Sequence, residues 1–62
     1  MNELQEIRHT LGLTQTELAA RLGVRQSTVS RWERGDLPLD ARTLLAARAL
    51  RAEAPAAAES AA

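Results

Sequence analysis

The stretch that decides the fold is LTQTELAARLGVRQSTVSRWERG, residues 13–35. Thr14 and Glu17 form the Thr-x-x-Glu pattern of a capping box, which predicts that a helix begins near residue 15. Gly23 predicts the end of this helix after Leu22, because glycine adopts the left-handed backbone conformation that commonly terminates helices.

A second short helix is predicted over residues 26–34, after a link formed by Val24 and Arg25, and Gly35 closes it. Two helices this short, joined by about three residues, cannot lie antiparallel and must cross steeply. The stretch therefore predicts a helix-turn-helix arrangement and an all-α fold.

A further helix is predicted on each side of this pair. Asn2 is suited to cap a helix over residues 3–11, whose apolar positions repeat at helical spacing and which Gly12 ends. Asp40 is suited to cap a helix over residues 41–53, which is rich in alanine and arginine.

The last nine residues, 54–62, contain no large apolar side chain, and Pro55 interrupts a helical pattern. We predict one helical domain over residues 1–53, with its helix-turn-helix at about 15–34, and a disordered alanine-rich tail over 54–62. The alternative is a further helical turn after Pro55, which would be unstable in water without packing.

Composition narrows the class of protein. A chain of 62 residues buries only about 60% of its unfolded surface, and without cysteine neither a disulfide nor a thiolate metal site can support it. One histidine, no lysine and no tyrosine are a poor supply for catalysis, so we expect no enzyme activity, no cofactor, no metal site and no small-molecule ligand. No apolar run is long enough to span a membrane.

The helix predicted over 26–34 has one apolar and one polar face. Val29 and Trp32 point inward at helical spacing, and no carboxylate lies on the opposite face. Side chains on that face are an amide, two hydroxyls and two guanidiniums, which suit the edges of bases in the major groove. They belong to Gln26, Ser27, Ser30, Arg31 and Arg34. Taken alone, such a face is more often an ordinary solvated surface, because polar outer faces are normal.

The string over residues 13–35 resembles the helix-turn-helix of lambdoid phage repressors and Cro proteins, the xenobiotic-response-element family of bacterial regulators. The resemblance covers about residues 3–52. It implies a compact four-helix, lambda-repressor-like domain that binds DNA. Many members have a fifth helix for pairing, for which this sequence has no evident counterpart.

The resemblance also implies roles for individual residues. A glutamine that opens the first helix of the motif, here Gln15, binds phosphate and braces the glutamine that opens the second, here Gln26. Base contacts are implied for Gln26, Ser27, Arg31 and Ser30. Phosphate contacts are implied for Gln15, Thr14, Arg25, Thr28, Arg34 and Arg42. Ser27 is shorter than the amide of many relatives, so Gln26 and Arg31 should carry most of the discrimination.

Arg8 and Glu33 match the positions of a partly buried ion pair in several relatives. We expect a structural role for this pair, because a carboxylate on the inner side of a helix needs a partner. His9 has no second metal ligand nearby in the sequence and is predicted to be an exposed surface residue.

The formal net charge of zero conceals a local imbalance. Residues 21–34 contain four arginines and one glutamate, a net charge of +3, whereas residues 53–62 contain two glutamates, a net charge of −2. Every cation is arginine, which favours bidentate recognition of phosphate and guanine. The positive charge therefore lies on the predicted DNA-contacting segment.

A single motif of this size contacts about 4 to 6 base pairs, so we expect a homodimer on an inverted-repeat operator of double-stranded DNA. The fourth predicted helix has a second apolar stripe that a monomer does not obviously bury. Candidate interface residues are Leu37, Leu39, Leu45, Ala49 and Ala52. The stripe equally fits alanine chosen for its helix propensity.

The leading hypothesis is a transcriptional regulator in the bacterial cytoplasm, associated with the nucleoid when bound, which represses its own promoter. A phage-encoded autorepressor that controls a counter-defence operon is a variant of it. The alternative is an antitoxin that binds a toxin as well as its own promoter. The tail has no apolar side chains that could anchor a toxin, which argues against this alternative.

Overall fold

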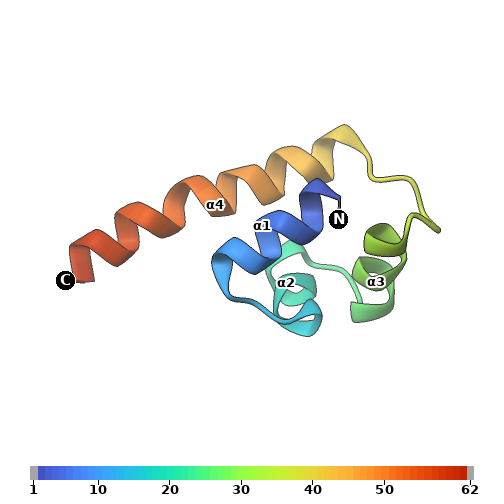
Figure 1. The fold of residues 1–62 in the computed structure, drawn as a ribbon, viewed down its shortest axis with the longest axis horizontal. Helices are drawn as coiled ribbons and strands as arrows, with labels where there is room; N and C mark the ends of the chain where they lie inside the picture. The colour runs from blue at the N-terminus through green and yellow to red at the C-terminus, as the bar shows by residue number, and fades with distance from the viewer. Residues whose placement is uncertain (1, 62) are drawn as a thin grey trace.

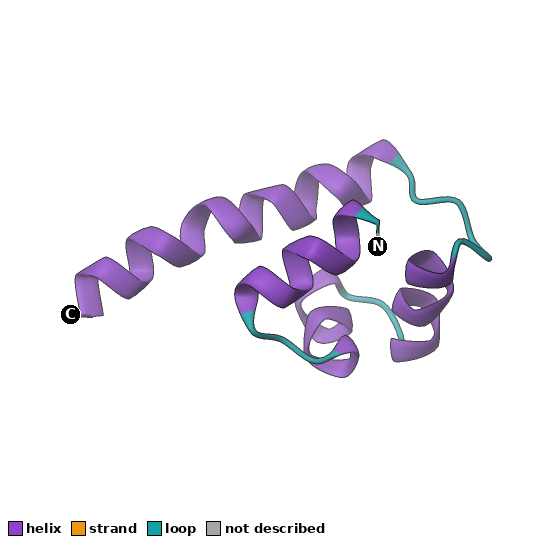
Figure 2. Ribbon diagram, in the orientation of Figure 1, coloured by secondary structure: helices purple, strands orange, loops and turns teal. Residues whose placement is uncertain are grey.

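The structure is a computed structural model that describes the backbone of residues 2–61 and the side chains of residues 2–53. It contains four helices: α1 (Glu3–Leu11), α2 (Gln15–Leu22), α3 (Gln26–Arg34) and α4 (Ala41–Ala61). Between residues 2 and 61 the chain forms no strand (Figure 2). The prediction of an all-α fold with four helices is therefore confirmed.

The predicted capping residues begin the helices. The side chain of Asn2 accepts a hydrogen bond from the Gln5 N–H at 2.9 Å, before α1. At α2, the Glu17 N–H donates to Thr14 Oγ1 at 3.1 Å and the Thr14 N–H donates to Glu17 Oε1 at 2.8 Å, which completes the capping box. Gly23 follows α2 with φ of 71°, the left-handed conformation that its lack of a side chain permits.

The end of α4 differs from the prediction. The sequence predicted that this helix ends at Glu53, whereas it continues through Pro55 to Ala61. Proline costs the helix one backbone hydrogen bond, but the positions after it are mostly alanine, the residue with the highest helix propensity. The division into a domain over 1–53 and a tail over 54–62 stays a prediction.

All four helices contribute to one small core. α1 packs against α4 and lies beneath it in Figure 1, α2 and α3 pack against each other, and α2 also contacts α4. Ala19 is 3% exposed, which fits a position where a larger side chain would separate two crossing helices. The buried side chains are Leu4, Ile7, Leu18, Ala19, Val29, Trp32 and Ala47. α3 is thereby held at one end of the molecule, with one face in the core and one in solvent.

Candidate nucleic-acid interface

The outer face of α3 carries the residues predicted to contact bases. Gln26, Ser27 and Arg31 are exposed, and Ser30 is half-buried. Val29 and Trp32 are buried on the opposite face of the helix. α3 thus presents polar side chains to solvent while two apolar side chains fix its inner face.

The predicted phosphate contacts surround this helix with varied exposure. Thr14, Arg25, Arg34 and Arg42 are exposed, whereas Thr28 and Gln15 are half-buried. Arg25 precedes α3 and makes no side-chain capping bond, because a guanidinium has no acceptor for the N–H groups at the start of a helix.

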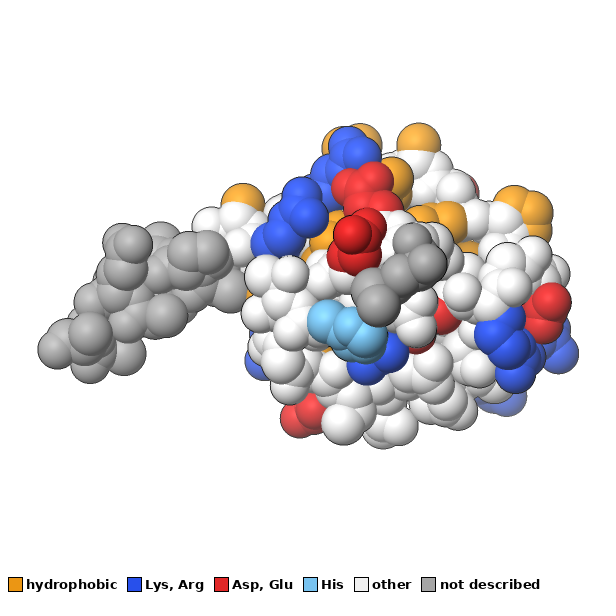
Figure 3. Space-filling view, in the orientation of Figure 1, with side chains coloured by type: hydrophobic (Ala, Val, Ile, Leu, Met, Phe, Trp, Pro, Cys, Tyr) orange, Lys and Arg blue, Asp and Glu red, His pale blue; other side chains and the backbone are white. Residues whose placement is uncertain are grey.

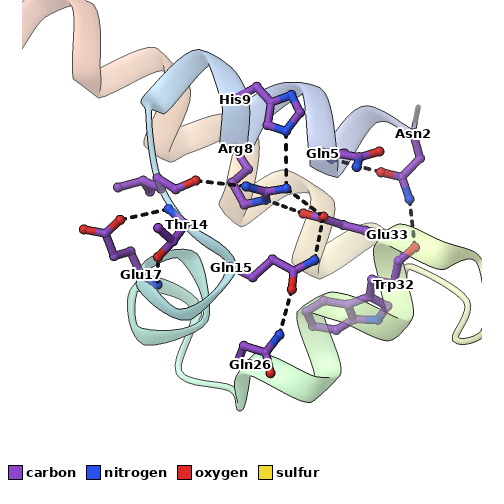
Figure 4. Close-up of polar contacts among 11 residues, drawn as sticks. Asn2, Gln5, Arg8, His9, Thr14, Gln15, Glu17, Gln26, Trp32 and Glu33 are labelled. Carbon is purple, nitrogen blue, oxygen red and sulfur yellow. Dashed lines mark hydrogen bonds and ion pairs between the residues drawn. The ribbon is translucent and has the colours of Figure 1, made fainter.

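Gln15 and Gln26 are directly connected, as Figure 4 shows. The Gln26 Nε2 donates to Gln15 Oε1 at 2.7 Å, and the Gln15 Nε2 donates to Glu33 Oε1 at 3.0 Å. Both ends of the Gln15 amide are therefore engaged within the protein. The bracing contact implied by the resemblance is present, but its extension to Glu33 was not predicted.

Glu33 is in turn held by Arg8 across α1 and α3. The Arg8 Nε donates to Glu33 Oε2 at 2.7 Å, and Nη2 donates to Oε1 at 3.0 Å (Figure 4). The third nitrogen of the guanidinium, Nη1, donates to the Leu13 carbonyl at 3.1 Å. The side chains of Arg8 and Glu33 are only 13% and 3% exposed. The ion pair expected from the sequence thus connects α1, the loop after it and α3.

This arrangement shifts the pKa of both partners. Burial raises the pKa of Glu33. The hydrogen bonds from Arg8 and Gln15, together with the charge of Arg8, lower this pKa by more than burial raises it, so it lies below its ordinary value. The hydrogen bond to Glu33 raises the pKa of Arg8. Glu33 is therefore ionised at neutral pH and acts only as a hydrogen-bond acceptor.

Two further polar contacts support the same region. His9 is exposed, as predicted, and its Nε2 lies 3.3 Å from Arg8 Nη2, so it accepts a hydrogen bond from a group that can only donate. Asn2 Nδ2 donates to the Trp32 carbonyl at 2.8 Å, which links the start of α1 to α3. No local pattern predicts this second contact, because its partners are 30 residues apart.

Arg34 has a carboxylate partner that the sequence analysis missed. Its Nε lies 3.1 Å from Asp36 Oδ2, and both side chains are more than 60% exposed. The spacing of two residues across the end of α3 was the available signal. In the free protein, a cation predicted to contact phosphate is therefore already paired with an acid.

A shallow apolar groove lies between the α2–α3 turn and the start of α4. Its volume is about 260 Å³, and Arg42 and Thr43 stand among its otherwise apolar lining. The other lining residues are Leu22, Val24, Trp32 and Ala46. Arg42 is thereby placed near the turn of the helix-turn-helix.

The candidate dimer residues separate into two groups. Leu37 and Leu39 are half-buried and pack against the protein's own core. Leu45 is 62% exposed, and Ala49 and Ala52 are exposed on the same helix. Hydrophobic side chains gather along the upper edge of the space-filling view, over α4 and the preceding loop (Figure 3). Within the described side chains, Leu45 is thus the large apolar residue that α4 exposes.

The described part of the chain has a helical backbone and scattered carboxylates, features that bear on membrane spans and metal sites. It contains no helix that is both long enough and apolar enough to cross a membrane. Histidine and carboxylate side chains do not gather there in groups of three or more that could hold a metal ion.

Comparison with families of known proteins matches most of the chain. A family model described as helix-turn-helix matches residues 4–51, which cover α1 from its second residue, all of α2 and α3, and the first half of α4. No curated protein and no solved structure matches the chain.

Proposed function

Because the chain belongs to the helix-turn-helix family of the xenobiotic-response-element, Cro and C1 type, we propose that it represses transcription by sequence-specific binding to an operator. DNA-binding regulation of transcription is the function of the family. We further propose that this chain is a repressor, that it binds an operator and that it does so as a dimer.

The observation that carries the proposal is the polar face of α3. Its exposed side chains are an amide, a hydroxyl and guanidiniums, on a helix whose inner face is fixed in the core. The amide of Gln26 suits adenine and the guanidinium of Arg31 suits guanine, each by a bidentate pair in the major groove. α3 therefore acts as the recognition helix, with Ser27 and Ser30 as shorter contacts.

Phosphate contacts flank this helix in the proposal. Arg25, Arg34 and Arg42 are exposed guanidiniums, and Thr14 is an exposed hydroxyl at the start of α2. Thr28 on α3 completes the proposed set. These contacts position the protein on the duplex, whereas the base contacts determine sequence preference.

Gln15 contacts phosphate in this proposal through its backbone. Its side-chain amide is engaged with Gln26 and Glu33. Its N–H lies in the first turn of α2, where a helix supplies no internal acceptor and the helix dipole favours an anion. One amide hydrogen of Gln15 Nε2 also remains for a phosphate oxygen.

A homodimer would contact a longer DNA sequence than one helix-turn-helix can contact alone. Two copies on an inverted repeat would place their recognition helices in successive major grooves, about 34 to 36 Å apart. The proposed contact surface is Leu45, Ala49 and Ala52 on α4, because these side chains are exposed whereas Leu37 and Leu39 pack against the core.

Selection of binding sites from random DNA tests the proposal. The wild type should select one inverted repeat, and Gln26→Ala or Arg31→Ala should each lose preference at one base position by about 1 to 3 kcal/mol. Arg48→Ala is the matched control for a lost charge, because Arg48 pairs with Glu3 on the α1–α4 side. A wild-type chain that selects no sequence, or α3 variants that select the same sites as the wild type, would refute the assignment.

A further inference from the structure

The two amides and the carboxylate near the start of α3 form a chain of hydrogen bonds with a defined direction. Gln26 donates to Gln15 at 2.7 Å, and Gln15 donates to Glu33 at 3.0 Å. Glu33 lies at the inner end of this chain and Gln26 at its exposed end. The direction in which each group donates is therefore set from inside the protein.

The direction follows from the chemistry of the inner end. Glu33 also accepts two hydrogen bonds from Arg8, which holds its carboxylate in one orientation. An ionised carboxylate can only accept, so the Gln15 amide must turn its NH₂ group toward it. The reverse orientation would place the Gln15 oxygen against a carboxylate oxygen. Gln15 consequently presents Oε1 to Gln26.

This orientation decides what Gln26 has left for DNA. Because Gln26 must donate to Gln15, it retains one N–H and its Oε1, a donor beside an acceptor. Adenine presents an acceptor, N7, beside a donor, N6, in the major groove. In the reverse direction Gln26 would accept from Gln15 and present two N–H groups, which suit the two acceptors of guanine, N7 and O6.

We infer that Glu33 determines the base preference of Gln26, as a positioning residue that fixes the direction of the hydrogen-bond chain and selects adenine over guanine. The inference rests on the proposed DNA-binding function. A purely structural role for Glu33 would instead lower stability and weaken binding to all sequences alike.

The base pair contacted by Gln26 is first identified as the position at which Gln26→Ala loses its preference. The test then measures binding to operators that differ only at this base pair. Glu33→Gln places an NH₂ group where Gln15 can accept from it, so both directions become available. We expect its preference for adenine over guanine to fall by about fivefold or more.

A second variant separates this effect from lost stability. Arg8→Met/Glu33→Leu replaces the ion pair by apolar side chains, a change that is often neutral or stabilising, and it also removes the acceptor for Gln15. We expect this variant to fold and to lose adenine preference as Glu33→Gln does. Glu3→Gln is the matched control, since it breaks the α1–α4 ion pair with Arg48 and leaves the chain of hydrogen bonds intact.

The outcomes are distinguishable. Unchanged adenine preference in both Glu33 variants, an equal loss in Glu3→Gln, or a wild type that prefers guanine at this position would overturn the inference and leave the proposed function standing. A wild type without any sequence preference would overturn the proposed function itself.

Discussion

Replacing Arg8 with methionine should strongly destabilise the protein. The substitution removes both hydrogen bonds from the guanidinium to Glu33 and the one to the Leu13 carbonyl. Glu33, whose side chain is 3% exposed, then keeps only its hydrogen bond from Gln15. A nearly buried carboxylate is left without a compensating charge.

The size of the effect follows from this burial. Removing one partner of a buried ion pair costs about 3 to 5 kcal/mol, and the 13% exposure of Arg8 places the cost near the lower end, at about 3 kcal/mol. A domain of this length has a total stability of about 3 to 9 kcal/mol. Arg8→Met should therefore remove at least a third of the free energy of unfolding.

Urea denaturation followed by the fluorescence of Trp32 measures this loss, because Trp32 is the single tryptophan and is buried in the core. Arg48→Met is the matched control. Its pair with Glu3 is far more exposed, at 48% and 35%, so its loss should be much smaller. Equal losses in the two variants, or a loss below about 1 kcal/mol for Arg8→Met, would refute the argument from burial.

The dependence of stability on pH is a second test of the Arg8–Glu33 ion pair. The pKa of Glu33 is lowered in the folded wild type, so its contribution to stability is present above the ordinary pKa of 4.5 and is lost as the pH falls through the folded value. Without Arg8, burial raises the pKa of Glu33 with less opposition, and protonation relieves the unpaired charge. The difference in free energy of unfolding between wild type and Arg8→Met should therefore be smaller at pH 4 than at pH 7. A pH of 4 is about half a unit below the ordinary glutamate pKa of 4.5. A constant difference would contradict this account.

Three further predictions concern other parts of the chain. Gly23→Ala should cost about 1 to 2 kcal/mol in urea denaturation, because φ is +71° and no heavy atom crowds the new methyl group, and Gly23→Asn should cost less; equal costs would contradict a backbone origin. Asp36→Asn should release Arg34, tighten binding to all DNA sequences and steepen the salt dependence by about one unit of slope in a log–log plot; an unchanged slope would show that Arg34 does not reach phosphate. Leu45→Glu should give a folded monomer with weakened operator binding in sedimentation and binding assays; a wild type that is already monomeric at micromolar concentration would contradict a preformed dimer.

The sequence predicted the features that depend on neighbouring residues. Caps act over three residues and glycine acts on its own backbone, so the boundaries of α1, α2 and α3 followed from local chemistry. The contact of Gln15 with Glu33 and that of Arg48 with Glu3 join residues 18 and 45 positions apart. Such contacts depend on how helices cross, which periodicity alone does not determine. The resemblance to a family supplied the Arg8–Glu33 pair where local pattern could not.

The error at the end of α4 has a related cause. Pro55 disfavours a helix locally and predicts a stop, but the strong helix propensity of the surrounding alanines outweighs it. Leu37 and Leu39 lie in the loop before α4, which suggested that they extend the apolar stripe of Leu45. Their burial depends on the path of the loop after α3, which the sequence does not specify.

The net charge of zero does not oppose binding to DNA, because most carboxylates of residues 2–53 already have partners within the protein. Three pair with arginines and two others cap helices: Glu3, Glu33, Asp36, Glu17 and Asp40. Within the same residues, Arg25 and Arg31 are exposed and have no ion-pair partner. Attraction to DNA would thus come mainly from a few arginines around α3. The electrostatic field of the protein would contribute little at long range. Since few counterions would be released, the salt dependence should be shallow, and affinity should depend on how well these few side chains are positioned.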